Sequence, residues 1–224
     1  MRFVFLFDVD NTLLDTDRVT ADLREFLREQ IGADEAQHYF ALFEQRRAEM
    51  GFADYLGALQ AYRNTHPHHA EITHASLYLL NYQFANRLLP NALDVIAYAK
   101  KFGTAVILSD GDVVFQPHKI ENAGLWDAVN GNVLIFIHKE QELDTVLEQF
   151  PADHYVMLDD KLRILDAAKK ILGTRVTTVF VRQGHYAHEP KHLEGFAPAD
   201  VTLERIGDFL QYDGERLLAA ARGN

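Results

Sequence analysis

The hydrophobic residues of the chain follow two kinds of pattern. Five apolar residues run without interruption from Phe3 to Phe7, and similar short runs recur later at 104–108, 133–137, 155–158 and 176–181. Continuous runs of this length are typical of strands that are buried on both faces of a parallel sheet. The segments before and between these later runs are long enough for helices, so the pattern predicts an α/β fold in which a parallel sheet is flanked by helices. We expect those helices at 91–101, 113–123, 140–150 and 162–172, with a weak strand and further helices after Asp200.

The segment between the first two predicted strands has a different pattern. From about residue 20 to residue 88, apolar residues recur at helical spacing and each stretch ends near a Gly or Pro. Four amphipathic helices are therefore predicted, and their apolar stripes require them to pack into a small bundle. Residues 17–89 would form this inserted domain, and residues 1–16 and 90–224 the α/β core. The expected stripes are Leu23, Phe26, Leu27 and Ile31; Tyr39, Phe40, Phe43 and Met50; Tyr55, Leu56, Leu59 and Tyr62; and Leu77, Leu80, Phe84 and Leu88.

The composition narrows the classes of partner. The 224 residues carry a formal net charge of −11, which disfavours nucleic acid because its phosphate backbone is bound by clustered Lys and Arg. Cysteine is absent, which excludes disulfides and is compatible with a reducing compartment. Neither a signal-peptide pattern nor an apolar stretch long enough to cross a membrane is present. We therefore expect a cytoplasmic protein, a monomer or small homo-oligomer, that binds neither nucleic acid nor a membrane.

Candidate chemistry lies where the predicted strands end. Since the carboxyl ends of parallel strands meet at one edge of a sheet, these polar residues should converge on one site. Several carboxylates there would repel a phosphate by about 4 kcal/mol per pair of unit charges at about 4 Å, unless a divalent cation offsets the repulsion. Oxygen ligands together with a substrate phosphate suit Mg²⁺, and the pattern predicts phosphoryl transfer. The residues concerned are Asp8 and Asp10, Ser109, Lys139, and Asp159 and Asp160.

Four motifs occur in a fixed order at these strand ends. They are Asp8-x-Asp10-x-Thr12 after the first strand, Ile107-Leu-Ser109, Lys139, and Met157-Leu-Asp-Asp160. With them the chain resembles phosphatases of the haloacid dehalogenase superfamily, which implies a Rossmann-like core with a helical cap of the C1 type. The inserted helices would be this cap, closing over the site.

The resemblance also implies a role for each motif residue. Asp8 would attack phosphorus and form an aspartyl-phosphate, while Asp10 would protonate the leaving oxygen and later activate water. Mg²⁺ would be held by Asp8, by the backbone carbonyl of Asp10 and by Asp160. Around these residues, Ser109 and Lys139 would bind the phosphoryl group together with the backbone N–H of Asp110, and Thr12 and Asp159 would support the site from the second layer.

Asp10 decides which reaction of the superfamily is expected. A halide leaves as a stable anion and needs no proton donor, whereas an alkoxide does need one, so Asp10 favours hydrolysis of a phosphate ester over dehalogenation. The expected substrate is a small phosphate monoester such as phosphoglycolate, a sugar phosphate or a nucleoside monophosphate. Two alternatives remain: a phosphomutase of the same family, and a non-hydrolytic Mg²⁺-binding phospho-acceptor or binding module.

Several residues fit the family pattern less well or have competing interpretations. Position 165 is Leu and the next acid, Asp166, comes one residue late for the last motif. Lys119 rivals Lys139 as the motif lysine, but the spacing of Lys139 from Asp160 favours Lys139. The remaining basic and aromatic residues are interpreted as solvated histidines (His66, His68, His69, His74, His185, His188 and His192), a solvated arginine face (Arg46, Arg47 and Arg63) and core aromatics, including Trp126.

Overall fold

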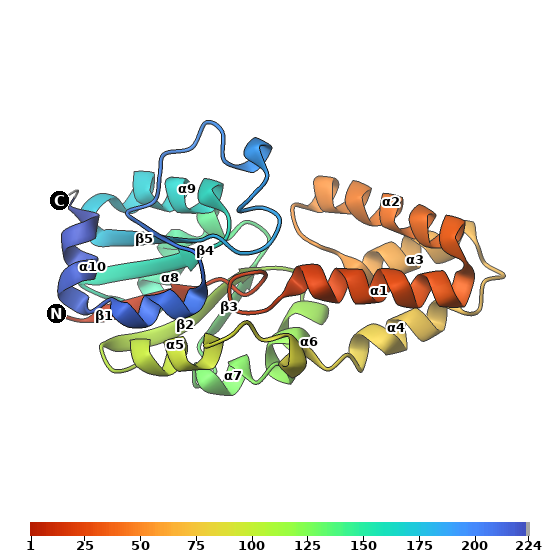
Figure 1. Ribbon diagram of the computed structural model, residues 1–224, viewed down its shortest axis with the longest axis horizontal. Helices are drawn as coiled ribbons and strands as arrows, with labels where there is room; N and C mark the ends of the chain where they lie inside the picture. The colour runs from red at the N-terminus through yellow and green to blue at the C-terminus, as the bar shows by residue number, and fades with distance from the viewer. Residues whose placement is uncertain (223–224) are drawn as a thin grey trace.

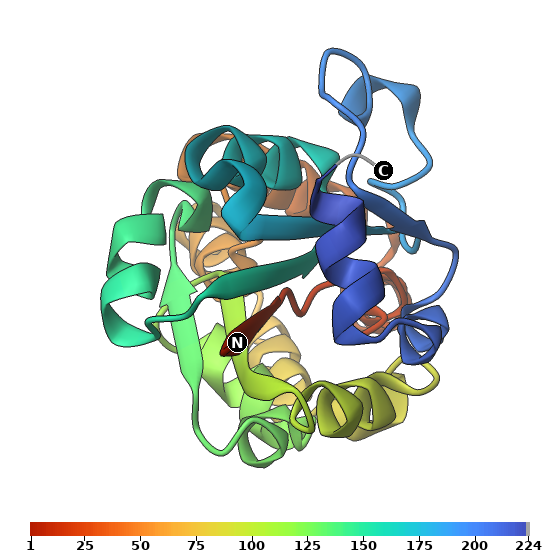
Figure 2. The same cartoon turned by 90° about the vertical axis from the view of Figure 1, so that its left-hand side faces the viewer.

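A six-stranded parallel sheet forms the centre of the protein. The computed structural model describes residues 1–222, and Figure 2 shows the twist of its sheet from the side of the N-terminus. The spatial order β3-β2-β1-β4-β5-β6 places β1 in the middle, paired with β2 on one side and β4 on the other. The predicted α/β fold with a parallel sheet is thereby confirmed. The strands are β1 (Phe3–Phe7), β2 (Gly103–Asp110), β3 (Val133–Phe136), β4 (His154–Asp159), β5 (Val176–Val181) and β6 (Val201–Leu203).

Helices cover both faces of this sheet. Successive side chains of a strand point to opposite faces, so Phe5 packs with the cluster that includes α5 and α10, whereas Leu6 packs with the cluster that includes α8 and α9. Both faces of β1 are buried, which explains its uninterrupted apolar run. The α-helices of the core are α5 (Ala92–Ala99), α6 (Phe115–Asn122), α7 (Leu125–Ala128), α8 (Leu143–Gln149), α9 (Leu162–Leu172) and α10 (Gly214–Ala221), the last of which follows β6. Short 3₁₀ helices connect them: η2 (Lys139–Gln141), η3 (Gly173–Arg175), η4 (Pro190–His192) and η5 (Ile206–Gln211).

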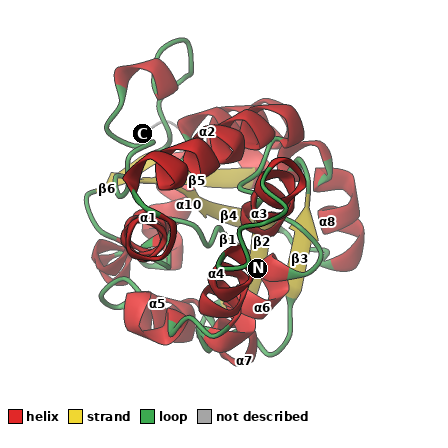
Figure 3. Ribbon diagram, turned by 90° about the vertical axis from the view of Figure 1, so that its right-hand side faces the viewer, coloured by secondary structure: helices red, strands yellow, loops and turns green. Residues whose placement is uncertain are grey.

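Four helices between β1 and β2 pack together beside the sheet. Figures 1 and 3 show α1 and α2 running side by side, with α3 and α4 packed against them. Their apolar stripes are buried as predicted at Leu23 and Leu27 on α1 and at Tyr39 and Phe43 on α2. The boundaries of this insertion as a separate domain, residues 17 and 89, stay a prediction. Its helices are α1 (Thr16–Ile31), α2 (Ala33–Met50), α3 (Tyr55–Thr65) and α4 (Ile72–Leu80), followed by the 3₁₀ turn η1 (Phe84–Arg87).

The fourth predicted helix is shorter than expected. It ends at Leu80 because the side chain of Asn81 donates a hydrogen bond to the carbonyl oxygen of Leu77, and the chain continues as η1. An Asn that bonds to nearby backbone competes with helix continuation. The helix also buries a different face from the one predicted, since Leu77 is 57 % exposed whereas Leu79 is fully buried.

Two core helices begin later than the sequence predicts. The helix expected from Val113 begins at Phe115, because Oδ1 of Asp112 accepts the N–H groups of Val114 and Phe115 and holds a turn before the helix. The helix expected from Glu140 begins at Leu143, after the single turn η2. Both short segments lie beside the carboxyl ends of β2 and β3.

Trp126 was predicted to lie in the core, and this is wrong. It is 36 % exposed, whereas its neighbour Leu125 is fully buried. Helix α7 has only four residues, and such a short turn buries one side chain and directs the next outward. None of the helices within residues 1–222 combines the length and apolar character that a membrane span requires.

Candidate active site

Asp8 and Lys139 form a buried ion pair at the end of the central strand. Oδ1 of Asp8 lies 2.5 Å from Nζ of Lys139, and its Oδ2 accepts a hydrogen bond of 3.1 Å from the hydroxyl of Thr12. Burial raises the pKa of Asp8 to about 6, although Lys139 acts in the opposite direction. Lys139 has no exposed surface; burial lowers its pKa, but Asp159 and Asp8 more than compensate and raise it. The preference for Lys139 over Lys119 as the partner of Asp8 agrees with this geometry.

Asp159 and Asp160 follow β4 and have different surroundings. Oδ2 of Asp159 lies 2.7 Å from Nζ of Lys139, and its Oδ1 accepts the backbone N–H of Lys161. Both oxygens of Asp160 are buried and have no hydrogen-bond partner within residues 1–222. Burial raises the pKa of Asp160 well above its usual value, and Asp8 and Asp159 add to this.

The three carboxylates can hold a cation. Asp8, Asp159 and Asp160 each offer an oxygen, and these oxygens lie within 4.8 Å of one another. An unsatisfied buried carboxylate is costly unless a cation or a proton compensates it. An oxygen-only set of carboxylates suits a hard divalent ion, so these residues fit Mg²⁺.

Asp10 lies beside this cluster but has its own set of partners. Its Oδ1 is 2.5 Å from Nζ of Lys119 and also accepts the hydroxyl of Thr16, while its Oδ2 accepts from Nε2 of Gln116. Burial raises the pKa of Asp10, but Lys119 and the Thr16 hydrogen bond outweigh it and lower the pKa to about 2. Lys119, the rival in the sequence interpretation, therefore belongs to the site as the partner of Asp10.

Ser109 and Asp110 end β2 close to these acids. The hydroxyl of Ser109 is fully buried and accepts a hydrogen bond of 2.8 Å from Gln116. Oδ1 of Asp110 accepts the backbone N–H of Lys139, which fixes the start of η2. Asp166, the late acid of the last motif, pairs instead with Lys170 on the outside of α9.

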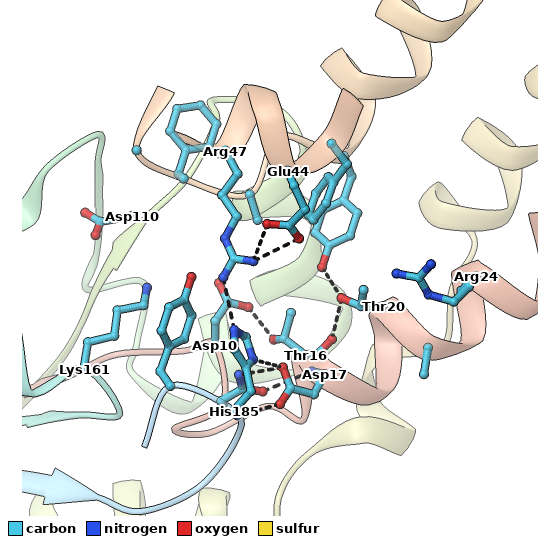
Figure 4. A pocket seen from close by; sticks show the side chains of 18 residues that line it. Asp10, Thr16, Asp17, Thr20, Arg24, Glu44, Arg47, Asp110, Lys161 and His185 are labelled. Carbon is cyan, nitrogen blue, oxygen red and sulfur yellow. Dashed lines mark hydrogen bonds and ion pairs between the residues drawn. The ribbon is translucent and has the colours of Figure 1, made fainter. Parts of the chain in front are cut away.

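A cavity of about 320 Å³ extends from Asp10 toward the inserted helices. Figure 4 shows Arg47 of α2 and His185 of the loop after β5 pointing into it, with Lys161 and Asp110 on the core side. The prediction that Arg47 lies on a solvated helix face is wrong: its guanidinium contacts Nε2 of His185 at 3.3 Å and lies over the ring of Tyr186. Gly51, in a left-handed conformation, ends α2 one turn later and donates its backbone N–H to the carbonyl oxygen of Arg47.

His185 is likewise not the solvated loop residue that was predicted. Its Nδ1 lies 2.6 Å from Oδ1 of Asp17, and its backbone N–H donates to Oδ2 of the same carboxylate. Burial opposes the ionisation of Asp17, but these bonds to His185 lower its pKa. Arg46 is also engaged, in an ion pair with Asp54, whereas Arg63 is exposed as expected.

The sequence of the core matches a known family. The family model of haloacid dehalogenase-like hydrolases matches residues 4–171, which is most of the chain. The chain belongs to the haloacid dehalogenase-like hydrolase family. The expected family is thereby confirmed, while the type of cap stays a prediction.

Solved structures of related hydrolases share this fold. A protein from Burkholderia xenovorans LB400 described as a haloacid dehalogenase-like hydrolase is 55% identical, with a TM-score of 0.92 over 96% of this chain and 98% of that one. The hydrolase YfnB from Bacillus subtilis, bound to magnesium, is 16% identical with a TM-score of 0.64, covering 94% and 98%. An L-2-haloacid dehalogenase from Xanthobacter autotrophicus is 20% identical with a TM-score of 0.61 over the same shares. The last two show the fold alone. A comparison with curated proteins gave no match.

The hydrolase has site residues that the sequence interpretation missed. Lys161 lines the cavity; burial lowers its pKa, but Asp160 and Asp8 outweigh this and raise it. Its position directly after two acids at a strand end was a usable signal. Gln116 and Lys119 lie three residues apart on the helix after Ser109, a spacing that places both on one helix face.

Proposed function

We propose that this hydrolase catalyses the Mg²⁺-dependent hydrolysis of a small phosphate monoester through an aspartyl-phosphate on Asp8. The observation that carries the proposal is the carboxylate of Asp160, which is buried without a hydrogen-bond partner beside Asp8 and Asp159. When ionised, Asp8, Asp159 and Asp160 outnumber Lys139 and Lys161, so a cation reduces the repulsion between the site and an anionic substrate.

Mg²⁺ would be held by Asp8 and Asp160 and by the backbone carbonyl of Asp10, with Asp159 supporting from behind through Lys139. When bound, the ion supplies positive charge that offsets the repulsion between the acids and the phosphoryl oxygens.

Asp8 supplies the nucleophile. Its carboxylate is held between Nζ of Lys139 and the hydroxyl of Thr12, which fixes the direction in which an oxygen can attack phosphorus. Lys139 keeps its charge because Asp159 and Asp8 raise its pKa. The ammonium group can therefore stabilise the charge that develops on the phosphoryl oxygens during transfer, and the buried Ser109 hydroxyl lies at the same strand edge for the same purpose.

Asp10 moves the protons. The leaving oxygen needs one proton, and the attacking water in the second half-reaction must lose one. Lys119 lies 2.5 Å from Asp10, which is ionised at neutral pH, so a proton passes from Lys119 by way of the Asp10 carboxylate to the strongly basic leaving oxygen as its bond to phosphorus breaks. In the second half-reaction the proton of the attacking water returns by the same path, which restores both Asp10 and Lys119. A dehalogenase would have no use for this pair.

The inserted helices are proposed to act as the cap. They close the cavity above Asp10 and contribute Arg47 and the ring of Phe43 to its wall. The cavity has the size of a small organic phosphate. Arg47 can bind a second anionic group of the substrate, for which a fork of N–H donors is well suited.

Phosphate release from a panel of monoesters, measured with and without Mg²⁺, tests the proposal. The panel should contain p-nitrophenyl phosphate, phosphoglycolate, hexose phosphates and nucleoside monophosphates. Asp8→Asn keeps the size of the side chain but removes the nucleophile, so it should abolish turnover. If wild type and Asp8→Asn release phosphate equally slowly from every ester, the proposal fails.

The same assays separate the alternatives. A phosphomutase would convert a hexose phosphate into its isomer without releasing inorganic phosphate, and a phospho-acceptor module would be labelled once by acetyl phosphate without turnover. Halide release from 2-chloropropionate would instead favour a dehalogenase, the activity named for the Xanthobacter autotrophicus relative.

A further inference from the structure

A second cluster of possible metal ligands lies in the inserted helices, at the end away from the sheet (Figure 1). Glu35 and His38 are on the first turns of α2, and His66 directly follows α3. Oε2 of Glu35 lies 3.6 Å from Nε2 of His66 and 3.9 Å from Nδ1 of His38. One donor atom from each of the three residues lies within 4.8 Å of the others. All three side chains are partly exposed, so an ion can reach them from solvent.

The hydrogen bonds of His66 determine which ring nitrogen faces the cluster. The hydroxyl of Thr65 donates its proton to the carbonyl oxygen of Tyr62, so it can only accept from Nδ1 of His66 at 2.9 Å. The second contact of Nδ1 is this same carbonyl oxygen of Tyr62, which is also an acceptor. These contacts occupy Nδ1, which leaves Nε2 facing the carboxylate of Glu35 at 3.6 Å. This distance is too long for a direct hydrogen bond and leaves room for a cation between the two atoms.

Tyr62 and His69 form a hydrogen-bonded chain that orients the carboxylate of Glu35. The hydroxyl of Tyr62 donates to Oε2 of Glu35 at 2.6 Å, so it accepts from Nδ1 of His69 at 2.9 Å. Hydrogen bonds that orient a ligating carboxylate are typical of metal sites, and here the bond is made to Oε2, the same oxygen that faces His66 and His38.

We propose that Glu35, His38 and His66 bind one divalent transition-metal ion of the Zn²⁺ type. Two imidazole nitrogens and one carboxylate oxygen form a ligand set that Zn²⁺ uses in proteins, with water in the remaining position. The nitrogen donors distinguish this site from the oxygen-only acids Asp8 and Asp160, which suit Mg²⁺. The ion would join the start of α2 to the end of α3, two elements that the hydrogen bond from Tyr62 to Glu35 also connects.

This arrangement corrects the interpretation of His66 as a solvated loop residue. The spacing Glu35-x-x-His38 places both side chains on one face of α2, but the third ligand comes from a segment 28 residues further along the sequence. Pairing of α2 with α3 brings them together, which sequence spacing alone does not reveal.

Calorimetric titration of ZnCl₂ into the metal-free, full-length protein tests the site. Excess MgCl₂ in the buffer occupies the acidic site, so the heat reports the second ion only. We expect one Zn²⁺ per chain, and visible absorption bands of a low-coordinate complex when Co²⁺ replaces Zn²⁺. Glu35→Gln and His66→Ala should each weaken binding by more than about 100-fold, and Tyr62→Phe, which removes only the supporting bond, by about 10- to 100-fold.

His74→Ala is the matched control, because His74 is an exposed histidine on the neighbouring helix α4. It should bind Zn²⁺ as tightly as wild type, and so should Asp160→Asn. Circular dichroism and thermal unfolding in EDTA verify that each variant is folded; should His66→Ala unfold, His66→Gln replaces it. Absence of stoichiometric binding by wild type, or binding that His66→Ala and Glu35→Gln leave unchanged, would overturn the proposal.

Discussion

The ammonium nitrogen of Lys119 lies 2.5 Å from Oδ1 of Asp10, and this pair is separate from the pair that Lys139 forms with Asp8. Each acid of the first motif thus has its own buried lysine. The pKa values of the two acids shift in opposite directions. Burial raises the pKa of Asp8 to about 6, whereas the pKa of Asp10 is lowered to about 2 despite burial. Environments that push two carboxyl pKa values apart are typical of acids with different catalytic roles.

Removing the charge of Lys119 should impair proton transfer at Asp10. In Lys119→Met, burial of Asp10 is no longer opposed by Lys119, so its pKa rises. We expect kcat/KM to fall by about 10²-fold or more, the size of a general acid–base contribution. Protonation of the nucleophile Asp8, whose pKa is about 6, should lower activity in both proteins as the pH decreases toward 5. The variant should show an additional loss from Asp10, which in wild type stays ionised throughout this range. The pH dependence of kcat/KM, measured on an active phosphate ester, checks this.

Lys170→Met is the control for this substitution. Lys170 forms an ion pair with Asp166 of α9, and the side chain of Lys170 is 71 % exposed whereas that of Asp166 is 5 % exposed. Removing Lys170 leaves a nearly buried carboxylate without this partner, so urea unfolding has to verify that the variant is folded in the assay. Its pH profile should match that of wild type, and a Lys119→Met profile parallel to wild type would contradict the role given to Lys119.

Asp160→Asn should have opposite effects on metal binding and on stability. It removes a proposed Mg²⁺ ligand, so half-maximal activity should require at least about tenfold more Mg²⁺. It also removes a buried charge that has no partner in the metal-free protein, so the free energy of unfolding in EDTA should rise by about 1–3 kcal/mol.

Asp166→Asn provides the comparison, since this acid pairs with Lys170 and lies outside the carboxylate cluster. Its Mg²⁺ requirement should equal that of wild type. Urea unfolding in EDTA and Mg²⁺ titration of activity give the two quantities. A Mg²⁺ requirement unchanged in Asp160→Asn would remove Asp160 from the metal site.

The sheet and the acids at its edge could be predicted because each depends on a short piece of sequence. The run Phe3–Phe7 is apolar throughout since both of its faces are covered, and Asp8 follows directly at its end. Because the carboxyl ends of parallel strands meet at one edge of the sheet, Ser109, Lys139 and Asp160 were expected at that same edge.

The cavity wall could not be predicted in this way. Arg47 and His185 are 138 residues apart and meet only because α2 and the loop after β5 approach each other over the site. Charged residues on an amphipathic helix are usually solvated, so the pattern around Arg47 gave no reason to place it in a cavity. Lys119 was recognised only as a rival to Lys139, because sequence spacing does not show that two lysines can serve two acids.

Arg47→Ala should affect substrate binding more than the chemical step. The guanidinium belongs to the inserted helices and points into the cavity, where it also pairs with Glu44 (Figure 4). If it binds a second anionic group of the substrate, its loss costs about 1.5–3 kcal/mol, which corresponds to a KM increase of about 10- to 100-fold with kcat less affected. Arg63→Ala, on the exposed face of α3, should leave both constants unchanged. A substrate with only one anionic group should show a smaller increase, which makes the comparison of esters informative.

His154 at the start of β4 should make stability depend on pH. The ring is 3 % exposed, and its Nε2 donates to the hydroxyl of Thr177, which itself donates to the carbonyl of Leu217. Burial, together with the charge of Lys169, lowers the pKa of His154. The unfolded chain therefore binds a proton at a higher pH than the native protein does. This contribution to stability is complete above the unfolded pKa of about 6.5 and is lost as the pH falls below it.

Replacing His154 with Gln should remove this part of the pH dependence. A Gln amide can still donate to Thr177 but does not titrate, so the decrease in the free energy of unfolding between about pH 7 and about pH 5 should be smaller than in wild type. Urea unfolding at both pH values measures the difference, and His74→Gln on the exposed face of α4 should behave like wild type. Because His154 lies at the amino end of β4, opposite Asp159 and Asp160 at its carboxyl end, activity at neutral pH should not change. An equally steep loss of stability in His154→Gln would mean that other groups govern the acid sensitivity.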